Sequence, residues 1–256
     1  MTPKVWAEPR FPALSECLWY HTIDLPGIGV VEGQWDLRET IDAYLGGIDV
    51  AGKRCLDVGT ASGFLTYEME RRGASAVVSM DLDPHVHEWE LVPFAAHAYD
   101  IAALRHRLEE TLPKVQNSYW LAHDLFKSQA RVHYGTAYHL PAALGHFDIA
   151  VVGMMLPHTE RPLRVLEQVA HLADRILVTQ QAPQIGDAWA YLMPDPDTLN
   201  PSGAWWSISD DCLARMLKIL GYEVIARVQA AHRCPLRGDS EVCTATVAER
   251  RIPRRV

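Results

Sequence analysis

The residues that point most directly to chemistry stand in a short glycine-containing segment of this 256-residue sequence. Asp57 lies near the end of an apolar run and is followed by Gly59 and Gly63, after which a helical pattern begins. Glycines at such a turn let main-chain N–H groups and a helix N-terminus approach a ligand closely. We therefore expect a ligand-binding loop that consists of Asp57, Gly59, Thr60, Ala61 and Gly63.

The carboxylate of Asp57 restricts the identity of that ligand. A dinucleotide-binding loop has glycine at this position, which leaves room for a pyrophosphate. Asp57 would repel a pyrophosphate but would accept hydrogen bonds from an ammonium group or from water. Asp81 ends the next apolar run, where a carboxylate can accept hydrogen bonds from both hydroxyls of a ribose, and Leu82 would pack on an adenine. These residues predict a nucleoside ligand with a cationic amino-acid tail.

The elements that must position these residues are alternating strands and helices. Apolar or β-branched runs at 54–58, 76–80, 147–152 and 175–179 predict strands. Helical patterns follow at 64–72 and at 163–172. Strands that alternate with helices predict a parallel sheet that is covered on both faces.

The pattern changes near the end of the chain. Runs at 222–228 and 242–247 leave no room for a helix between them, which predicts an antiparallel hairpin. The helix that precedes this hairpin has Ser209 as its expected N-cap and Gly221 as its stop.

Two segments lie outside this repeating pattern. We expect residues 1–50 to form an N-terminal extension or lid, with a helix at 38–45, and residues 51–256 to form the main domain. Residues 181–206 predict a long loop that ends in Trp205 and Trp206. These two tryptophans and Trp35 could wall a pocket for a planar or apolar acceptor, although adjacent tryptophans can also divide between core and surface.

The segment Leu56–Gly63, with the sequence LDVGTASG, resembles the first motif of class I S-adenosylmethionine-dependent methyltransferases. The segments WYHTIDL (19–25) and GQWDLR (33–38) resemble a bacterial subgroup related to the enzymes that carboxymethylate the tRNA wobble uridine. The resemblance implies S-adenosylmethionine as the cofactor. It also implies a Rossmann-like three-layer α/β sandwich, whose mostly parallel seven-stranded sheet ends in a C-terminal antiparallel hairpin.

The resemblance implies further contacts with the cofactor. Residues 131–135 resemble the third strand, which is usually followed by an acid that binds the adenine amino group. Thr136 stands there in this chain and gives a weaker signature. Gly153 and Met154, at the end of the fourth strand, would border the cofactor, or the methionine would belong to the core.

Methyl transfer from a sulfonium needs a general base only if the nucleophile must lose a proton. His158 is the first candidate because it follows the fourth strand at the carboxyl edge, where ligands of open α/β sheets bind. The alternative is a structural hydrogen-bonding role. His21 and Tyr20 are the second candidates as part of a lid, and their alternative role is a packed aromatic strap.

Composition restricts the partners and the location. The formal net charge of -8 argues against a nucleic-acid partner, and the chain has no apolar run long enough for a membrane span. Its N-terminus does not resemble a signal peptide, so we expect a cytoplasmic protein. The five cysteines lack C-x-x-C spacing and the histidines are dispersed, so we expect no metal site.

The leading hypothesis is a methyltransferase that acts on oxygen or nitrogen of a small molecule, in secondary metabolism or in sugar modification. One alternative is a tRNA wobble-uridine modifying enzyme that uses carboxy-S-adenosylmethionine. The other is a non-catalytic cofactor-binding protein of the same fold. The sequence leaves the oligomeric state open between a monomer and a homodimer.

Overall fold

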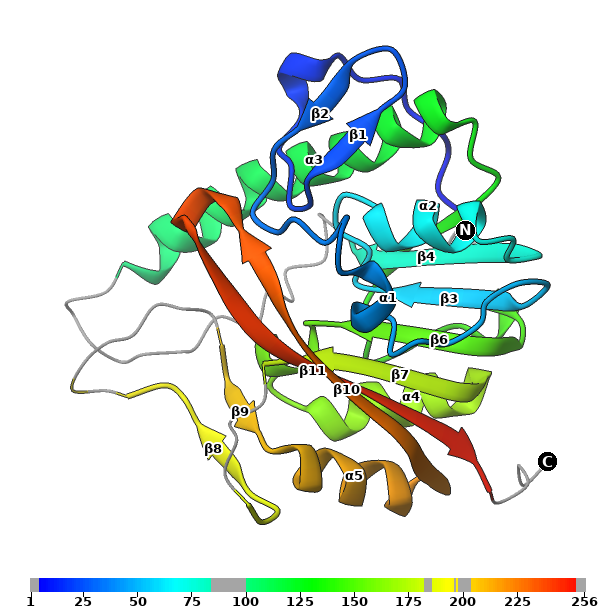
Figure 1. Cartoon of the computed structure of the whole chain (residues 1–256). Helices are drawn as coiled ribbons and strands as arrows, with labels where there is room; N and C mark the ends of the chain where they lie inside the picture. Colours follow the sequence, from blue (N-terminus) through cyan, green and yellow to red (C-terminus); the bar gives the residue numbers. More distant parts are fainter. Residues whose placement is uncertain (1–4, 84–99, 182–185, 196, 198–203, 252–256) are drawn as a thin grey trace.

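The computed structural model describes residues 5–83, 100–181, 186–195, 197 and 204–251. Its main sheet has seven strands in the order β10-β11-β7-β6-β3-β4-β5 (Figure 1). The strands from β7 to β5 in this order are parallel, whereas β11 is antiparallel to β7 and to β10. The predicted fold class is therefore confirmed. The seven strands are β3 (Arg54–Val58), β4 (Ala76–Leu82), β5 (Arg131–Gly135), β6 (Phe147–Gly153), β7 (Ala173–Gln180), β10 (Tyr222–Cys234) and β11 (Asp239–Arg250).

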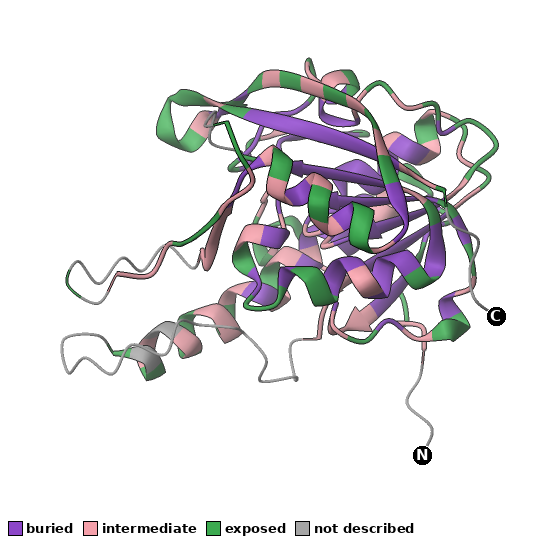
Figure 2. Ribbon diagram, turned by 90° about the horizontal axis from the view of Figure 1, so that it is seen from below, coloured by how far each residue is buried: buried purple, intermediate pink, exposed green. Residues whose placement is uncertain are grey.

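Helices cover both faces of this sheet, and the strands are buried between them (Figures 1 and 2). Within β6, Ile149 and Val151 belong to one core cluster, whereas Ala150 and Val152 belong to the other. Because both faces of the strand are buried, it reads as a continuous apolar run rather than an alternating one. The helices are α1 (Ile41–Tyr44), α2 (Phe64–Arg71), α3 (Ile101–Phe126), α4 (Pro162–Leu172) and α5 (Asp210–Ile219), with short 3-10 turns η1 (Leu14–Glu16), η2 (Ala142–Leu144), η3 (Leu156–His158) and η4 (Pro235–Arg237).

Two small hairpins accompany the main sheet. β1 (Ile23–Leu25) pairs with β2 (Gly29–Val31), and β8 (Ala190–Leu192) pairs with β9 (Trp206–Ile208). The second pair lies partly within the predicted loop at 181–206, so that prediction was wrong for 190–192 and for Trp206. Among the described residues, no helix combines the length and the apolarity that a membrane span requires.

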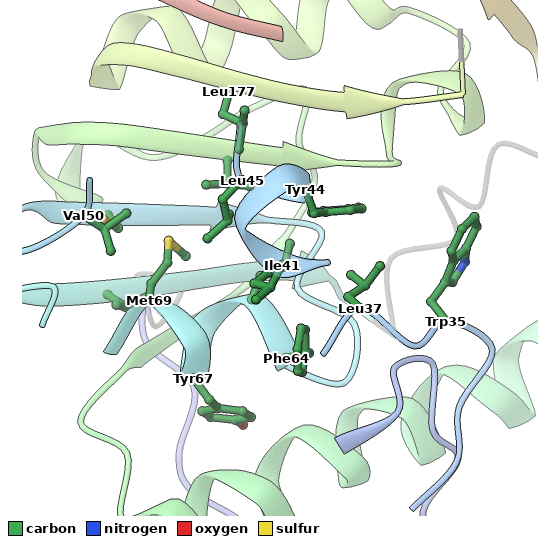
Figure 3. Close-up of a cluster of buried hydrophobic side chains, with 14 of the residues drawn as sticks. Trp35, Leu37, Ile41, Tyr44, Leu45, Val50, Phe64, Tyr67, Met69 and Leu177 are labelled. Atoms are coloured by element: carbon green, nitrogen blue, oxygen red, sulfur yellow. The ribbon is translucent and has the colours of Figure 1, made fainter. Parts of the chain in front are cut away.

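The N-terminal segment packs into the main core. Ile23, Leu25, Trp35 and Leu37 are each at most 5% exposed and belong to the cluster that covers the α2 face of the sheet. Figure 3 shows part of this cluster, with Trp35 and Tyr44 on the side toward which the sheet strands point. The helix predicted at 38–45 is shorter than expected, because α1 spans only Ile41–Tyr44.

Candidate functional site

The predicted ligand-binding loop connects β3 to α2 at the carboxyl edge of the sheet. The backbone N–H groups of Gly59 and Thr60 both donate to the Met80 carbonyl, at 2.8 and 3.1 Å, which ties the loop to β4. Gly63 begins the helix with a φ of 86°, and a Cβ there would lie 2.7 Å from the Tyr67 and Tyr119 rings. Only glycine combines this backbone conformation with so close an approach.

The Asp57 side chain is fully buried below the loop. Its Oδ2 accepts hydrogen bonds from the Thr60 and Thr66 hydroxyls, at 2.7 and 2.8 Å. Its Oδ1 has no hydrogen-bond partner within the described part of the chain. Burial raises the pKa of Asp57 to about 6, against the opposing effect of the two hydroxyls. A buried carboxylate oxygen without a donor is costly, so this atom fits a ligand group that donates hydrogen bonds.

Asp81 holds the other side of the loop. Its Oδ2 accepts from the Ala61 N–H at 2.6 Å, and its Oδ1 accepts from the Leu82 N–H at 2.7 Å. Burial raises the pKa of this carboxyl group, and the two backbone donors oppose that effect. The carboxylate is thus fixed in orientation at the carboxyl end of β4.

A cavity of about 180 Å³ lies beside Asp81. The residues that line it come from the ends of β4 and β5, from the loop after β3 and from η3. They are Gly59, Met80, Asp81, Leu82, Thr136, Ala137, Tyr138, Met155, His158 and Thr159. Four of the residues predicted to bind the cofactor therefore meet at one cavity, at the edge where open α/β sheets bind ligands. His158, the first predicted base, lines the same cavity.

Gly153 and Met154 lie at the end of β6. A Cβ on Gly153 would lie 3.0 Å from the Tyr44 hydroxyl oxygen, so the glycine admits this side chain. Met154 adopts a φ of 52°, and its N–H donates to the Thr179 carbonyl at 2.7 Å. Neither residue lines the cavity beside Asp81.

His21 contacts the loop directly through Ser62. Its backbone N–H donates to the Ser62 Oγ at 2.9 Å, and its Nδ1 lies 3.2 Å from the same oxygen. Its ring packs against the rings of Tyr20 and Phe64. Burial lowers the pKa of His21 to about 3, so the imidazole is neutral at neutral pH. Sequence reasoning missed Ser62, although its place next to Gly63 in the loop was a usable signal.

The three predicted substrate-binding tryptophans do not form one group. Trp35 packs in the core cluster on the α2 face, whereas Trp206 packs against the cluster on the opposite face. The Trp206 Nε1 donates to the Glu160 carbonyl at 3.0 Å, and the Trp205 N–H donates to the Pro157 carbonyl at 2.7 Å. Trp205 and Trp206 therefore lie at η3 and the segment after it, while Trp35 lies at the N-terminal segment.

A larger hollow of about 610 Å³ lies along α2 and the end of α3. Two of the basic residues that line it form ion pairs: Arg71 with Glu68 at 2.6 Å, and Lys127 with Asp124 at 3.1 Å. We assign this hollow no role. Among the described residues, no three histidine, cysteine, aspartate or glutamate side chains are grouped to hold a metal ion.

Known proteins resemble this chain in sequence and in fold. A family model described as a methyltransferase domain matches residues 34–227. A ribosomal protein L11 methyltransferase of Leptospira interrogans is 32% identical over 60 residues, which span 23% of this chain but only 20% of that protein.

The solved structures share the fold at low identity. The N-terminal domain of EvdMO1, solved with S-adenosylhomocysteine and D-fucose, has a TM-score of 0.55 at 17% identity and covers 91% of each chain. A methyltransferase of Methanosarcina mazei has a TM-score of 0.52 at 15% identity, over 85% of this chain and 100% of that one. The 1,6-didemethyltoxoflavin-N1-methyltransferase of Burkholderia thailandensis has a TM-score of 0.50 at 16% identity, over 84% of this chain and 78% of that one.

The family match covers most of the chain and includes the parallel strands from β3 to β7 and the glycine loop after β3. This chain belongs to the methyltransferase domain family.

Proposed function

We propose that the protein methylates an oxygen or nitrogen atom of a small-molecule acceptor. The observation that carries this proposal is the group of rings beside the cofactor loop, where His21 binds Ser62 and packs between Tyr20 and Phe64. Aromatic side chains beside a cofactor loop suit a compact organic acceptor. The names of two similar structures, one solved in the presence of D-fucose and one a 1,6-didemethyltoxoflavin-N1-methyltransferase, support the same class of acceptor.

We propose that the methyl donor is S-adenosylmethionine and that different residues around the loop bind different chemical groups of it. The free Asp57 Oδ1 would accept from the ammonium group of the amino-acid tail. Asp81 would bind the ribose hydroxyls, and Leu82 and Thr136 would contact the adenine. When bound, the cofactor supplies an electrophilic methyl group and a neutral leaving group. Because His158 lines the same cavity, we assign it to the nucleoside rather than to the acceptor.

The protein's own contribution to the chemistry is to hold the reactants in line and to exclude water. Gly153 and Met154 would border the reacting groups at the end of β6. His21, with a pKa of about 3, is a weak base. We therefore propose that His21 positions the loop through Ser62 and does not take a proton from the acceptor.

The tRNA-modifying alternative needs a cation for the extra carboxylate of carboxy-S-adenosylmethionine. Arg38, in the segment that resembles that subgroup, already forms two hydrogen bonds with Asp36, both at 2.8 Å. This pairing favours the simple methyl donor. Binding to a tRNA backbone would also give a steep salt dependence, which we do not expect for an acidic chain.

Calorimetric titration with S-adenosylmethionine, S-adenosylhomocysteine, the carboxy form and NAD tests the donor. We expect the first two to bind tightly, and Asp81→Ala to weaken their binding by about 1.5–3 kcal/mol, because the carboxylate would bind both ribose hydroxyls. His158→Ala should also weaken cofactor binding, whereas Asp124→Ala, at the exposed end of α3, should not. Tight NAD binding, or cofactor affinity unchanged in Asp81→Ala, would contradict the assignment.

Methyl transfer itself is measured with a labelled methyl donor and a panel of small hydroxylated and nitrogen-containing compounds. Transfer to a member of this panel is the expected result. Cofactor binding without transfer to any of them would favour the non-catalytic alternative. Tight binding of tRNA that weakens steeply with salt would favour the tRNA-modifying alternative.

A further inference from the structure

A continuous line of buried polar side chains runs from the cofactor loop to α3. Its members are Asp57 from β3, Thr66 from α2, Ser79 from β4 and Tyr119 from α3, and each is at most 1% exposed. The Thr66 Oγ1 lies 2.8 Å from the Asp57 Oδ2 and 2.7 Å from the Ser79 Oγ. The Tyr119 hydroxyl lies 2.8 Å from the same Ser79 oxygen. The donor binding proposed above gives no part to Ser79 or Tyr119.

The sheet and its covering helices bring these side chains together. Asp57 and Ser79 are register partners in the parallel strands β3 and β4, so their side chains lie next to each other on one face. Their neighbours on that face, Cys55 and Val77, belong to the apolar core cluster. Polar groups in such surroundings must bond to one another, and α2 and α3 each supply a hydroxyl for this purpose.

An ionised Asp57 fixes the direction of each hydrogen bond in the line. A carboxylate only accepts, and a hydroxyl has one proton to donate. Thr60 and Thr66 both bond to the Asp57 Oδ2, so each donates its proton there, and the 3.0 Å contact between the two threonine oxygens holds no proton. Thr66 then accepts from Ser79, and Ser79 accepts from Tyr119. The Tyr119 phenol is therefore the first donor of the line.

This direction favours the charged form of Asp57. A hydroxyl that accepts a hydrogen bond is polarised by it and becomes a stronger donor, so the effect of Tyr119 reaches the carboxylate through two other hydroxyls. Burial raises the pKa of Tyr119, so the phenol keeps its proton and can donate it. A protonated Asp57 could itself donate to Thr66, and the line would then have no fixed direction.

We propose that Tyr119 is a positioning residue for the methyl donor: acting through Ser79 and Thr66, its hydroxyl holds Asp57 in the ionised form that binds the ammonium group of the amino-acid tail. This inference rests on the proposed function, in which the Asp57 Oδ1 accepts from that ammonium group. It gives α3 a part in donor binding, although two hydroxyls separate Tyr119 from the carboxylate.

Other titratable groups also act on the Asp57 carboxylate. Asp81, at the end of β4, opposes its ionisation by like charge. Cys55 from β3, Tyr44 from α1 and Tyr67 from α2 are also in electrostatic contact with it. Burial raises the pKa of all three, to about 12 for Cys55, so they stay uncharged near pH 6. Of these groups, Asp81 is the one that can also carry a charge there.

Removal of single hydroxyl groups tests the role of Tyr119. Tyr119→Phe and Ser79→Ala each interrupt the line. Tyr67→Phe is the matched control, because the buried Tyr67 hydroxyl donates to the Tyr119 carbonyl at 2.6 Å and lies outside the line. Figure 3 shows the Tyr67 side chain extending from α2 toward α3. Affinity for S-adenosylhomocysteine is measured by calorimetry between pH 5 and pH 8 for the unaltered chain and each variant.

We expect Tyr119→Phe and Ser79→Ala to weaken binding about three- to tenfold at pH 5.5 but less than about twofold at pH 8, because Asp57 becomes harder to ionise. The pH at which affinity rises should therefore move upward by about 0.5–1 unit. Tyr67→Phe should leave that pH unchanged. The double variant Ser79→Ala, Tyr119→Phe should move it no further than either single variant, because both changes break the same line.

A loss of affinity that is equal at every pH, or no loss, would overturn the inference, because a purely structural role does not depend on the charge of Asp57. The same upward move in Tyr67→Phe would assign the effect to packing and also refute it. Near-ultraviolet circular dichroism checks folding, and either line variant suffices for the test. Binding to the unaltered chain is measured first: its absence contradicts the proposed function, whereas binding without the expected pH pattern contradicts only this inference.

Discussion

At the scale of single residues, Asp57 links cofactor binding to pH. Its pKa of about 6 lies above its ordinary value of 3.8, so the folded chain binds a proton more tightly than the unfolded chain does. The contribution of this group to stability therefore falls as pH rises from about 4 to 6. A bound ammonium group favours the ionised carboxylate, so affinity for S-adenosylhomocysteine should increase as pH rises through about 6.

Calorimetry in buffers of different ionisation enthalpy measures this effect. Near and below pH 6 we expect ligand binding to release a proton. Asp57→Asn keeps an oxygen for the Thr60 and Thr66 hydroxyls but cannot ionise, so the release attributed to position 57 should disappear. An undiminished proton release in this variant would assign the titration to another group, of which Asp81 is the nearest candidate.

Substitutions at the contact between His21 and Ser62 distinguish a positioning role of His21 from a catalytic role. Ser62→Ala leaves the buried His21 N–H without its acceptor, and His21→Phe keeps a packed ring but removes Nδ1. If the pair holds the loop, each variant should weaken cofactor binding about five- to thirtyfold, and the double variant should be little worse than either. If His21→Phe abolishes transfer at saturating cofactor while cofactor affinity is unchanged, His21 is the base.

At the scale of elements, the N-cap residue of α5, Ser209, bonds both to the first turn of that helix and to the segment before the β8–β9 hairpin. The Ser209 Oγ accepts from the N–H groups of Cys212 and Trp189, at 3.2 and 3.1 Å, and donates to the Asp187 carbonyl at 2.8 Å. Loss of a serine N-cap usually costs about 0.5–2 kcal/mol. Because two further bonds are lost, Ser209→Ala should lower the free energy of unfolding by about 2 kcal/mol in urea denaturation. Ser240→Ala, at the exposed start of β11, should change it by less than about 0.5 kcal/mol.

The sequence predicted those elements whose signals are local. β6 and β7 were recognisable because burial on both faces gives continuous apolar runs. The 26-residue helix α3 was not predicted, since Pro113 interrupts its pattern. The three-residue strands of the two small hairpins are too short to show any periodicity.

In the candidate site too, some residues could be predicted from local sequence and others could not. The positions of Asp57 and Asp81 near the ends of β3 and β4, and of the glycine loop directly after β3, could be predicted from the local sequence. The place of Tyr44 depends on its contact with Gly153, and that of His232 on its hydrogen bond to Thr40, 192 residues away. Such contacts exist only in the folded chain, so no local pattern could show that the hairpin and α1 meet.

At the scale of the whole molecule, the described part of the N-terminal segment contributes side chains to the core, so we predict that it is needed for folding. Figure 1 shows the β1–β2 hairpin lying over α3, and the core on this face includes Ile23, Leu25, Trp35 and Leu37. Burial of each large apolar side chain contributes about 1.5–3 kcal/mol, whereas a domain of this kind has only about 5–15 kcal/mol of net stability.

A chain that begins at residue 51 should therefore fail to fold, because the α2 face of its sheet would lose these partners. Circular dichroism in the near ultraviolet and urea denaturation would show no cooperative transition, and S-adenosylhomocysteine should not bind. A truncated chain that folds and binds the cofactor, but no longer transfers the methyl group, would instead support the predicted lid. The triple variant Phe11→Ser, Leu14→Ser, Leu18→Ser, at exposed positions of the same segment, should unfold like the full chain. That comparison separates the loss of core packing from a change in surface hydrophobicity, and it decides whether the cofactor loop can be formed without the segment that carries His21.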